Sequence, residues 1–207
     1  MIPQAPFLCF ITDDALSPVA LTEQALRGGA AMIQLRHKSA SSNQLFSWAV
    51  EIRKLCRNYG ATLIINDRAD IALASQADGV HLGQQDLPAA AARKLLGKKY
   101  IIGVSASSPS EAVQAERDGA DYIGFGHIFP TSSKEKAFLP LGPESLGQVA
   151  SLVTLPIIAI GGIHAENAAS LISLGASAVA VISAISRATN PLQTALELTE
   201  AIKRRVE

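Results

Sequence analysis

The stretch TLIINDRADIALASQADGVHLGQQD, residues 62–86, contains the unit from which the fold can be predicted. Two short apolar runs, Thr62 to Asn66 and Gly79 to Leu82, lie on either side of a short helical pattern from Arg68 to Ser75. A strand, a helix and a second strand in this order form a βαβ unit, whose two strands run parallel. An acidic residue follows each run, so we expect both acids at the same edge of the sheet.

The same alternation of short apolar runs and helical patterns continues in both directions along the chain. The expected strands run from Phe7 to Thr12, Ala31 to Arg36, Thr62 to Asn66, Gly79 to Leu82, Tyr100 to Val104, Tyr122 to Phe125, Pro156 to Ile160 and Ala178 to Ile182. The expected helices run from Pro18 to Arg27, Asn43 to Tyr59, Arg68 to Ser75, Pro88 to Leu96, Pro109 to Asp118, Pro143 to Leu152, Ala165 to Ser173 and Pro191 to Arg205.

Eight strands that alternate with eight helices predict a (β/α)8 TIM barrel. We expect one domain over residues 1–207, because no stretch rich in Pro, Ser or charge interrupts the chain as a linker would. A doubly wound open sheet is the alternative. The closed barrel is favoured because no G-x-G-x-x-G follows the first strand and both ends of the chain carry complete units.

The composition limits the classes of partner. Apolar residues make up 48% of the chain and aromatic residues only 5%, as suits buried parallel strands covered by Ala-rich helices. Eighteen basic residues balance eighteen acidic ones, so no long-range field attracts nucleic acid or an anionic membrane. No apolar run approaches the roughly 18 residues of a membrane span. We therefore expect neither a nucleic-acid nor a membrane partner.

The cysteines and the first residues indicate where the protein works. Cys9 lies in an apolar run and Cys56 in a helical pattern, so two buried free thiols are expected rather than a disulfide. The beginning of the chain, MIPQAPFLCFITDD, has no basic segment before its apolar stretch and does not resemble a secretory signal. A reducing cytoplasm is the expected location.

Asp67 and Asp86 are the first candidate functional residues, because they end neighbouring strands in the predicted barrel. Two carboxylates that leave water in place commonly hold Mg²⁺, with substrate phosphate oxygens completing the octahedron. The alternative is that each acid caps the helix that follows it.

Gln34, Arg36 and Lys38 occupy alternate positions, so their side chains are expected to face one side together. A guanidinium beside a mobile ammonium suits a diphosphate, because charge is spread over several oxygens. Asn66 would most simply point into the barrel, although a strand end allows it to turn toward the anion. A solvated pair of cations at the rim is the alternative for Arg36 and Lys38.

The segment 126–142 is the longest loop-like stretch after a strand. Its hydroxyls and lysine, Thr131, Ser132, Ser133 and Lys134, are candidates for holding a second anionic group, whereas Lys136 is expected to face water. A loop of this length in a compact domain is often a lid. A disordered surface loop is the alternative.

Two glycines after the seventh strand indicate a phosphate site. Gly161 and Gly162, together with Ile182 and Ser183 after the eighth strand, occupy the place where barrels bind phosphate through backbone N–H groups. Glycine allows an anion to approach the main chain closely. This feature predicts a phosphorylated substrate without identifying it.

The histidines are less decisive. His81 lies within a strand and is expected to be a hydrogen-bonded interior group, whereas His37 and His164 are expected to be exposed. His127 follows Gly126 at a strand end, where a general acid or base could act, and packing beneath the loop is the alternative.

Six motifs carry a specific resemblance: QLRHK, IINDRADIALASQADGVHLGQQDLP, IIGVSA, GADYIGFGHIFPTSSK, IIAIGGI and AVAVISAI. Together they resemble the thiamine phosphate synthase family, also called thiamine phosphate pyrophosphorylases, over nearly the whole chain. The resemblance implies a (β/α)8 barrel that acts as a transferase. It implies that hydroxymethylpyrimidine diphosphate and a thiazole phosphate are joined, giving thiamine phosphate and pyrophosphate.

The matching motifs also imply roles for individual residues. The Mg²⁺ ligands would be Asp67 and Asp86. The diphosphate contacts would be Arg36, Lys38, Asn66 and Lys134. Gln34 and Ser105 would lie against the pyrimidine, and the thiazole phosphate would be held by Thr131, Ser133, Gly162, Ile182 and Ser183. The residues expected to act in catalysis are Arg36, Lys38, Ser105 and Lys134.

One position departs from the family pattern. The synthases commonly have GPIFPT, whereas this chain has GHIFPT, with His127 in place of proline. That histidine resembles the related TenI-like thiazole tautomerases, which use it for proton transfer. Those relatives usually lack the second acid, present here as Asp86, and tend to have a Cys-containing loop in place of FPTSSK. The synthase is therefore the favoured interpretation.

Three functions can be distinguished by experiment. A transferase requires Mg²⁺ and releases pyrophosphate, whereas a tautomerase is independent of metal and sensitive to His127→Asn. A ligand-binding regulator without turnover is the third, and nothing in the sequence specifically favours it. The sequence leaves the oligomeric state open, with a homodimer as one option.

Overall fold

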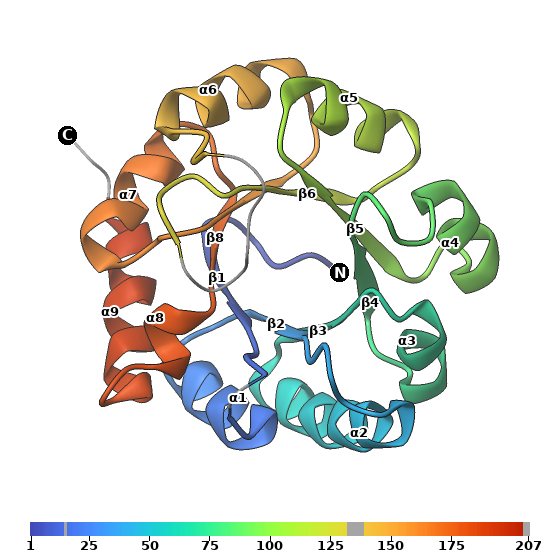
Figure 1. Ribbon diagram of the computed structural model, residues 1–207. Coiled ribbons are helices and arrows are strands. Elements are labelled where there is room, and N and C mark those ends of the chain that lie inside the picture. The colour runs from blue at the N-terminus through green and yellow to red at the C-terminus, as the bar shows by residue number, and fades with distance from the viewer. Residues whose placement is uncertain (15, 132–138, 205–207) are drawn as a thin grey trace.

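Eight short parallel strands close into a barrel in the computed structural model, which describes residues 1–14, 16–131 and 139–204. Each strand pairs with its neighbours in chain order, and β8 pairs back onto β1 (Figure 1). The strands are β1 (Phe7–Ile11), β2 (Met32–Leu35), β3 (Thr62–Asn66), β4 (Gly79–Leu82), β5 (Ile101–Ala106), β6 (Tyr122–Gly126), β7 (Ile157–Ile160) and β8 (Ala178–Val181).

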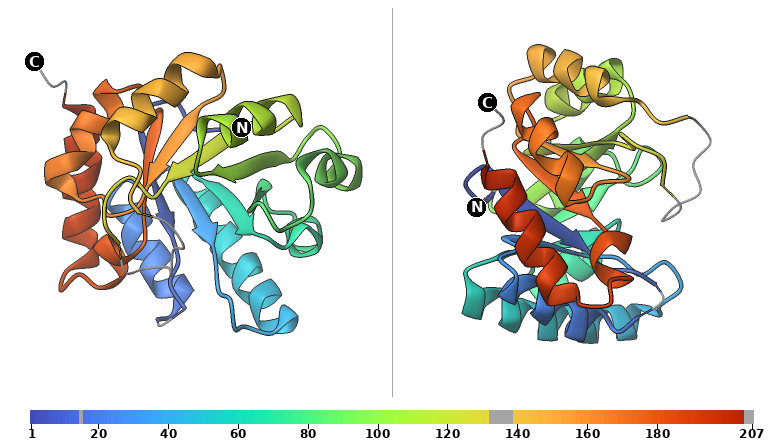
Figure 2. Two further views of the ribbon diagram at one scale, coloured as in Figure 1. Left: turned by 45° about the horizontal axis from the view of Figure 1, so that its top comes forward. Right: turned by 90° about the vertical axis from the view of Figure 1, so that its left-hand side faces the viewer.

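Helices form the layer outside the strands, as the view along the barrel in Figure 1 and the turned views in Figure 2 show. Within the described ranges they are α1 (Pro18–Arg27), α2 (Ser42–Tyr59), α3 (Ala69–Ser75), α4 (Ala89–Leu96), α5 (Pro109–Arg117), α6 (Pro143–Leu152), α7 (Ala165–Ser173), α8 (Ser183–Ser186) and α9 (Pro191–Lys203).

The predicted (β/α)8 barrel is confirmed, and the open-sheet alternative is wrong because β1 and β8 pair in register from Phe7 opposite Ala178. Every predicted strand and helix is present, with ends that shift by no more than two residues. The exception to the prediction is α8, a single turn directly after β8 that the sequence pattern did not reveal.

Alternate side chains of each strand face opposite sides of the barrel wall. In β1, Leu8 and Phe10 pack outward against the helices, whereas Phe7, Cys9 and Ile11 belong to a second cluster inside the barrel. Both faces of the strands are therefore buried, which explains why the strands appear in the sequence as continuous apolar runs.

The amino end of the barrel is covered by the first residues of the chain. The Met1 carbonyl accepts a hydrogen bond of 3.0 Å from the Thr62 hydroxyl at the start of β3, and Ile2 packs against the interior cluster. The N-terminus accordingly lies within the ring of strands in Figure 1. Access to the interior is left to the opposite, carboxyl end of the strands.

Cys9 and Cys56 are free and buried, as predicted. Burial raises the pKa of each thiol to about 12, and the negative charge of Asp78 adds to the effect at Cys56. Among the described residues, no helix combines the length and the apolar character that a bilayer crossing needs.

Candidate active site

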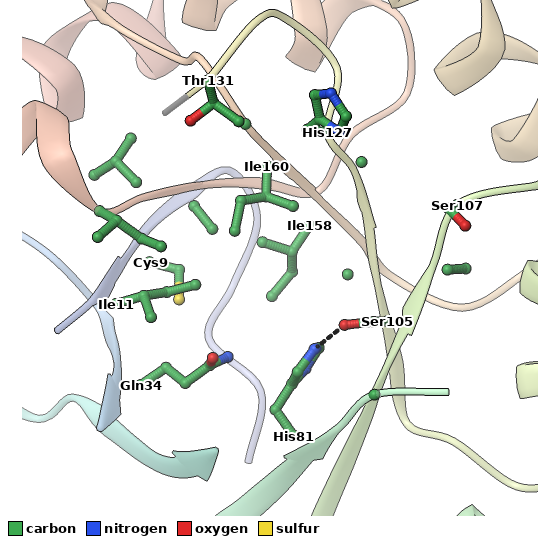
Figure 3. A pocket seen from close by; sticks show the side chains of 18 of the residues that line it. Cys9, Ile11, Gln34, His81, Ser105, Ser107, His127, Thr131, Ile158 and Ile160 are labelled. Carbon is green, nitrogen blue, oxygen red and sulfur yellow. Dashed lines mark hydrogen bonds between the residues drawn. The ribbon is translucent and has the colours of Figure 1, made fainter. Parts of the chain in front are cut away.

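A cavity of about 580 Å³ enters the barrel from the carboxyl ends of the strands. Figure 3 shows polar side chains at two ends of this cavity, with Gln34, His81 and Ser105 at one end and Thr131 and His127 at the other. The wall between them is apolar and includes Cys9, Ile11, Ile158 and Ile160. The space suits a molecule with a flat apolar body and polar groups at both ends.

Two carboxyl groups and an ammonium meet beside the cavity: Lys38 and Asp86 line it, whereas Asp67 is not among the described lining residues but contacts both. Asp67 follows β3 with a φ of 62°, a left-handed conformation uncommon for a residue other than glycine. Its Oδ2 lies 2.5 Å from Nζ of Lys38, and its carboxyl group also hydrogen-bonds the side chain of Asp86. Asp86 in turn accepts a hydrogen bond of 2.7 Å from the backbone N–H of Gly83. The two acids, which follow neighbouring strands, therefore contact each other.

The shared contact moves the two carboxyl pKa values in opposite directions. Burial alone would raise the pKa of Asp67, but the hydrogen bonds from Lys38 and Asp86 and the nearby positive charge bring this pKa below its usual value. Burial, followed by the hydrogen bond and charge of Asp67, raises the pKa of Asp86. Asp67 therefore carries the negative charge more readily than Asp86 does.

The capping alternative for the two acids is wrong. Arg68 is the N-cap of α3 and Pro88 is the N-cap of α4, and neither helix has a side-chain cap hydrogen bond. The carboxylates are directed to Lys38 and Gly83 instead, which leaves their oxygens near the cavity rim.

The cationic segment after β2 only partly follows the prediction. Gln34 and Lys38 line the cavity, but Arg36 is not among the described residues that line it. The strand ends at Leu35, so the alternation of side chains stops before Arg36. The Arg36 guanidinium instead lies 3.3 Å from Asp14 and is mostly buried.

The backbone of this segment is held from the end of β1. The buried hydroxyl of Thr12 donates to the Arg36 carbonyl and accepts from the Arg36 N–H, both at 2.8 Å. Asp14 accepts a further hydrogen bond of 3.0 Å from the backbone N–H of Lys38. These contacts replace the strand pairing that ends at Leu35. They hold the backbone from which the side chains of Arg36 and Lys38 extend.

The remaining polar candidates lie at different depths. Asn66 is buried opposite His81 in the pairing of β3 with β4 and is not among the cavity-lining residues that the structure describes. Ser105 and Thr131 do line the cavity. Ser133 and Lys134, as well as Ser132, Lys136 and the rest of residues 132–138 in the proposed lid, lie outside the described residues.

The phosphate-site prediction places four residues together, and all four line the cavity: Gly161, Gly162, Ile182 and Ser183. The φ values of Gly161 and Gly162 are 103° and 64°, in the range that favours glycine. A Cβ at Gly161 would collide with His127, and one at Gly162 would lie 2.5 Å from the Pro130 carbonyl. Ser183 begins α8, so the helix that the prediction missed starts at this site.

The four histidines differ in their surroundings. His81 is a buried, hydrogen-bonded interior group and His164 is exposed, as predicted. His127 is buried and lines the cavity. The prediction for His37 is wrong, because its half-buried ring packs against Trp48 at a centroid distance of 5.0 Å.

Several cavity residues were not found from the sequence. Tyr122 lies at the start of β6 and points inward, next to His81. The alternation of strand side chains could have placed it there once the inward face of β6 was known. Glu111 also lines the cavity, but its carboxylate accepts hydrogen bonds from Ser107, and no sequence signal distinguished it from an ordinary first-turn helix acid.

Comparisons with known proteins agree with this geometry. The family model described as thiamine monophosphate synthase matches residues 8–185. A thiamine-phosphate synthase of Chlorobium limicola is 60% identical over 207 residues, covering 100% of this chain and 99% of that protein. A thiamine-phosphate synthase of Moorella thermoacetica is 51% identical over 184 residues, covering 89% of this chain and 88% of that protein.

A solved structure extends the similarity to the fold. Thiamine phosphate pyrophosphorylase from Pyrococcus furiosus superimposes with a TM-score of 0.89 at 38% identity, covering 95% of both chains. A 3-hexulose-6-phosphate synthase, at 19% identity and a TM-score of 0.72, shares the fold alone. With the family model matching most of its length, and with relatives of this identity, the chain belongs to the thiamine monophosphate synthase family.

Proposed function

We propose that this chain joins hydroxymethylpyrimidine diphosphate to a thiazole phosphate and releases thiamine phosphate and pyrophosphate. The observation that carries the proposal is the contact of Asp67 with both Lys38 and Asp86 at the rim of a cavity with an apolar wall. A diphosphate needs cations and a divalent metal site, and a flat ring needs such a wall. The family of the chain supports the same reaction.

The donor set at the rim fits Mg²⁺. Asp67 and Asp86 offer carboxylate oxygens, the hard ligands that this ion prefers. No cluster of three or more His, Cys, Asp or Glu that could hold a metal occurs in the described part of the chain. When bound, the ion would neutralise charge on the diphosphate oxygens.

We assign the other residues by their places in the family motifs. Of these residues, the ones that also line the cavity are Gln34, Lys38, Ser105, Thr131, Gly161, Gly162, Ile182 and Ser183. Gln34 and Ser105 bind the pyrimidine ring. The diphosphate contacts are Arg36, Lys38, Asn66 and Lys134. The thiazole phosphate is held by Thr131, Ser133, Gly161, Gly162, Ile182 and Ser183.

The reaction needs no protein nucleophile. The bond between the pyrimidine CH₂ and the diphosphate oxygen breaks, the electron pair leaves with pyrophosphate, and the thiazole nitrogen supplies the pair for the new bond. Lys38, Arg36 and Lys134 stabilise the charge that arrives on the leaving group. The amino-substituted ring delocalises the positive charge left on carbon, and the apolar wall keeps water from competing with the thiazole.

The decisive experiment incubates the protein with both precursors, with and without Mg²⁺, and measures thiamine phosphate and pyrophosphate. Formation of both products only with Mg²⁺ supports the transferase. Lys134→Ala should lower turnover by roughly 10²-fold, as the loss of one preorganised charge typically does.

A parallel incubation with the thiazole carboxylate phosphate tests the tautomerase. His127 in the cavity is the observation that favours this second candidate. Isomerisation without metal that is lost in His127→Asn would replace the proposed function. Phosphate binding without either turnover would indicate a regulator. A cytoplasmic location stays a prediction, and a homodimer stays one option for the assembly.

A further inference from the structure

A chain of hydrogen bonds crosses the interior of the barrel along the wall of the cavity. His81 of β4 contacts the Tyr122 hydroxyl of β6 through Nδ1 and the Ser105 hydroxyl of β5 through Nε2, each at 2.9 Å. Figure 3 shows the second of these contacts at the polar end of the cavity. The three side chains therefore form one connected unit that ends at Ser105, and the Tyr122 hydroxyl at its other end also hydrogen-bonds the side chain of Gln34.

The neighbouring strands leave room for this unit. A Cβ at Gly103 would collide with the ring of Tyr122, and a Cβ at Gly124 would lie 2.8 Å from Cε1 of His81. Both glycines have ordinary backbone angles in strands, so their small size matters here rather than their flexibility. The space for the Tyr122 and His81 rings is therefore built into β5 and β6.

The contacts link the orientation of one hydroxyl to that of the other. Burial raises the pKa of Tyr122 well above its usual value, so its hydroxyl keeps its proton. A neutral imidazole donates through one ring nitrogen and accepts through the other. When Tyr122 donates to Nδ1, Nε2 donates to Ser105, and the reverse arrangement reverses both bonds. Ser105 is thus not free to rotate independently.

All three members of the unit line the cavity, and Ser105 is the most exposed of them. Tyr122 is 1% exposed and His81 is 8% exposed, whereas Ser105 is only half-buried. The backbone at Ser105 is also held, because Nε2 of Gln84 donates to its carbonyl at 2.6 Å. Both the main chain and the hydroxyl of Ser105 are therefore fixed before a ligand arrives, which lowers the entropic cost of binding.

We propose that His81 is a positioning residue that fixes the Ser105 hydroxyl against the heteroaromatic ring of the substrate, with Tyr122 holding His81 from behind. This inference rests on the proposed function, because it assigns the ring that Ser105 meets to the pyrimidine. It adds a role for two residues that do not themselves bond to the reacting atoms.

Two substitutions at His81 separate the two contacts. In His81→Gln the side-chain amide reaches the position of Nε2 and can still bond Ser105. In His81→Asn the shorter amide reaches the position of Nδ1 and bonds only Tyr122. We expect His81→Asn to lower kcat/KM about tenfold or more, and His81→Gln to recover most of that loss.

A double-substitution cycle tests whether His81 acts through Ser105. Ser105→Ala removes the hydroxyl, so His81→Asn added to it should change kcat/KM by no more than about twofold. Calorimetric titration with hydroxymethylpyrimidine alone supplies a readout apart from turnover. Its dissociation constant should rise in His81→Asn and in Ser105→Ala but not rise further in the double variant.

Tyr122→Phe tests the far end of the unit and keeps the ring that fills the space beside Gly103. We expect weaker binding of hydroxymethylpyrimidine, whereas Tyr59→Phe, at the exposed end of α2, should leave it unchanged. Circular dichroism of every variant checks that the barrel is intact.

The outcomes distinguish this inference from the proposed function. An active wild type with independent, multiplicative effects of His81→Asn and Ser105→Ala overturns the positioning role and leaves the function standing. Equal losses in His81→Gln and His81→Asn overturn it as well. A wild type without synthase activity and without affinity for hydroxymethylpyrimidine overturns both.

Discussion

Nζ of Lys38 lies 2.5 Å from Oδ2 of Asp67, which joins the loop after β2 to the end of β3. The same carboxyl group contacts Asp86 after β4. Three consecutive strand ends therefore converge on one point, where the groups suited to an anion meet the groups suited to a divalent cation. This convergence depends on the parallel barrel, because only parallel strands place successive carboxyl ends at one rim.

Removing the charge of Asp67 tests that point directly. We expect Asp67→Ala, and the isosteric Asp67→Asn, to lower turnover by roughly 10²-fold, because a preorganised electrostatic group is lost. The Mg²⁺ concentration for half-maximal rate should also rise. Initial rates of pyrophosphate release across a Mg²⁺ titration provide the measurement. Glu200→Gln, an exposed acid on α9, is the control, and near-normal activity of the Asp67 variants would remove this residue from the mechanism.

The glycines of the phosphate site offer a second test with a matched control. Gly162 and Gly60 have nearly the same backbone φ, 64° and 66°. A Cβ at Gly60 would meet no atom within 4 Å, whereas one at Gly162 would lie 2.5 Å from the Pro130 carbonyl. Gly60→Ala therefore lowers the free energy of unfolding only through the strain of an alanine in the left-handed conformation, about 1–2 kcal/mol. Gly162→Ala adds a collision with the backbone.

We expect Gly162→Ala to lower the free energy of unfolding more than Gly60→Ala does, and to raise the KM for the thiazole phosphate. Urea unfolding and steady-state kinetics measure the two effects. Equal stability losses together with an unchanged KM would show that the anion does not approach the backbone at Gly162.

The fold could be predicted from the sequence because its signals are local. Parallel strands buried on both faces appear as short apolar runs, and prolines such as Pro109 and Pro143 begin the helices between them. The topology then determines which strand ends are neighbours. The order of the strands alone therefore predicts that Asp67 and Asp86 lie close together.

The details of the site required the coordinates, because they depend on where regular structure stops. The alternation that placed Arg36 beside Gln34 assumed a strand that continues, and β2 ends at Leu35. The partners of His81 belong to β5 and β6, far away in the sequence. Periodicity indicates which face a residue occupies but not which side chain it meets there.

The hydroxyl that holds the cationic segment provides a third prediction. Thr12→Val keeps the shape of the side chain but leaves the N–H and carbonyl of Arg36 without their 2.8 Å partner. Unsatisfied buried groups cost about 1–3 kcal/mol, so the free energy of unfolding should fall by that amount. The KM for the pyrimidine diphosphate should rise as well.

Thr154→Val is the matched control, because the exposed Thr154 hydroxyl only donates to Glu116. Its stability should change by no more than about 0.5 kcal/mol. If Thr12→Val matched this control in both stability and KM, the contact from β1 would not position Arg36.

Alkaline stability should reveal the buried thiol inside the barrel. The pKa of Cys9 is about 12 in the folded chain against about 9 for an ordinary thiol, because burial disfavours the thiolate. A raised pKa means that the folded state binds the proton more tightly, so this contribution is complete below pH 9 and is lost as the pH rises toward 12. Cys9→Ala removes the titration.

At neutral pH the stability difference between wild type and Cys9→Ala measures only the loss of packing. Between pH 8 and pH 10 that difference should shrink by about 1 kcal/mol. Above the pKa of the unfolded thiol, each pH unit raises the ratio of thiolate to thiol in the unfolded chain tenfold, which stabilises the unfolded state. Other alkaline groups affect both proteins equally and cancel in the comparison. A difference that stays constant over this range would show that the Cys9 thiol ionises as readily in the barrel as in the unfolded chain.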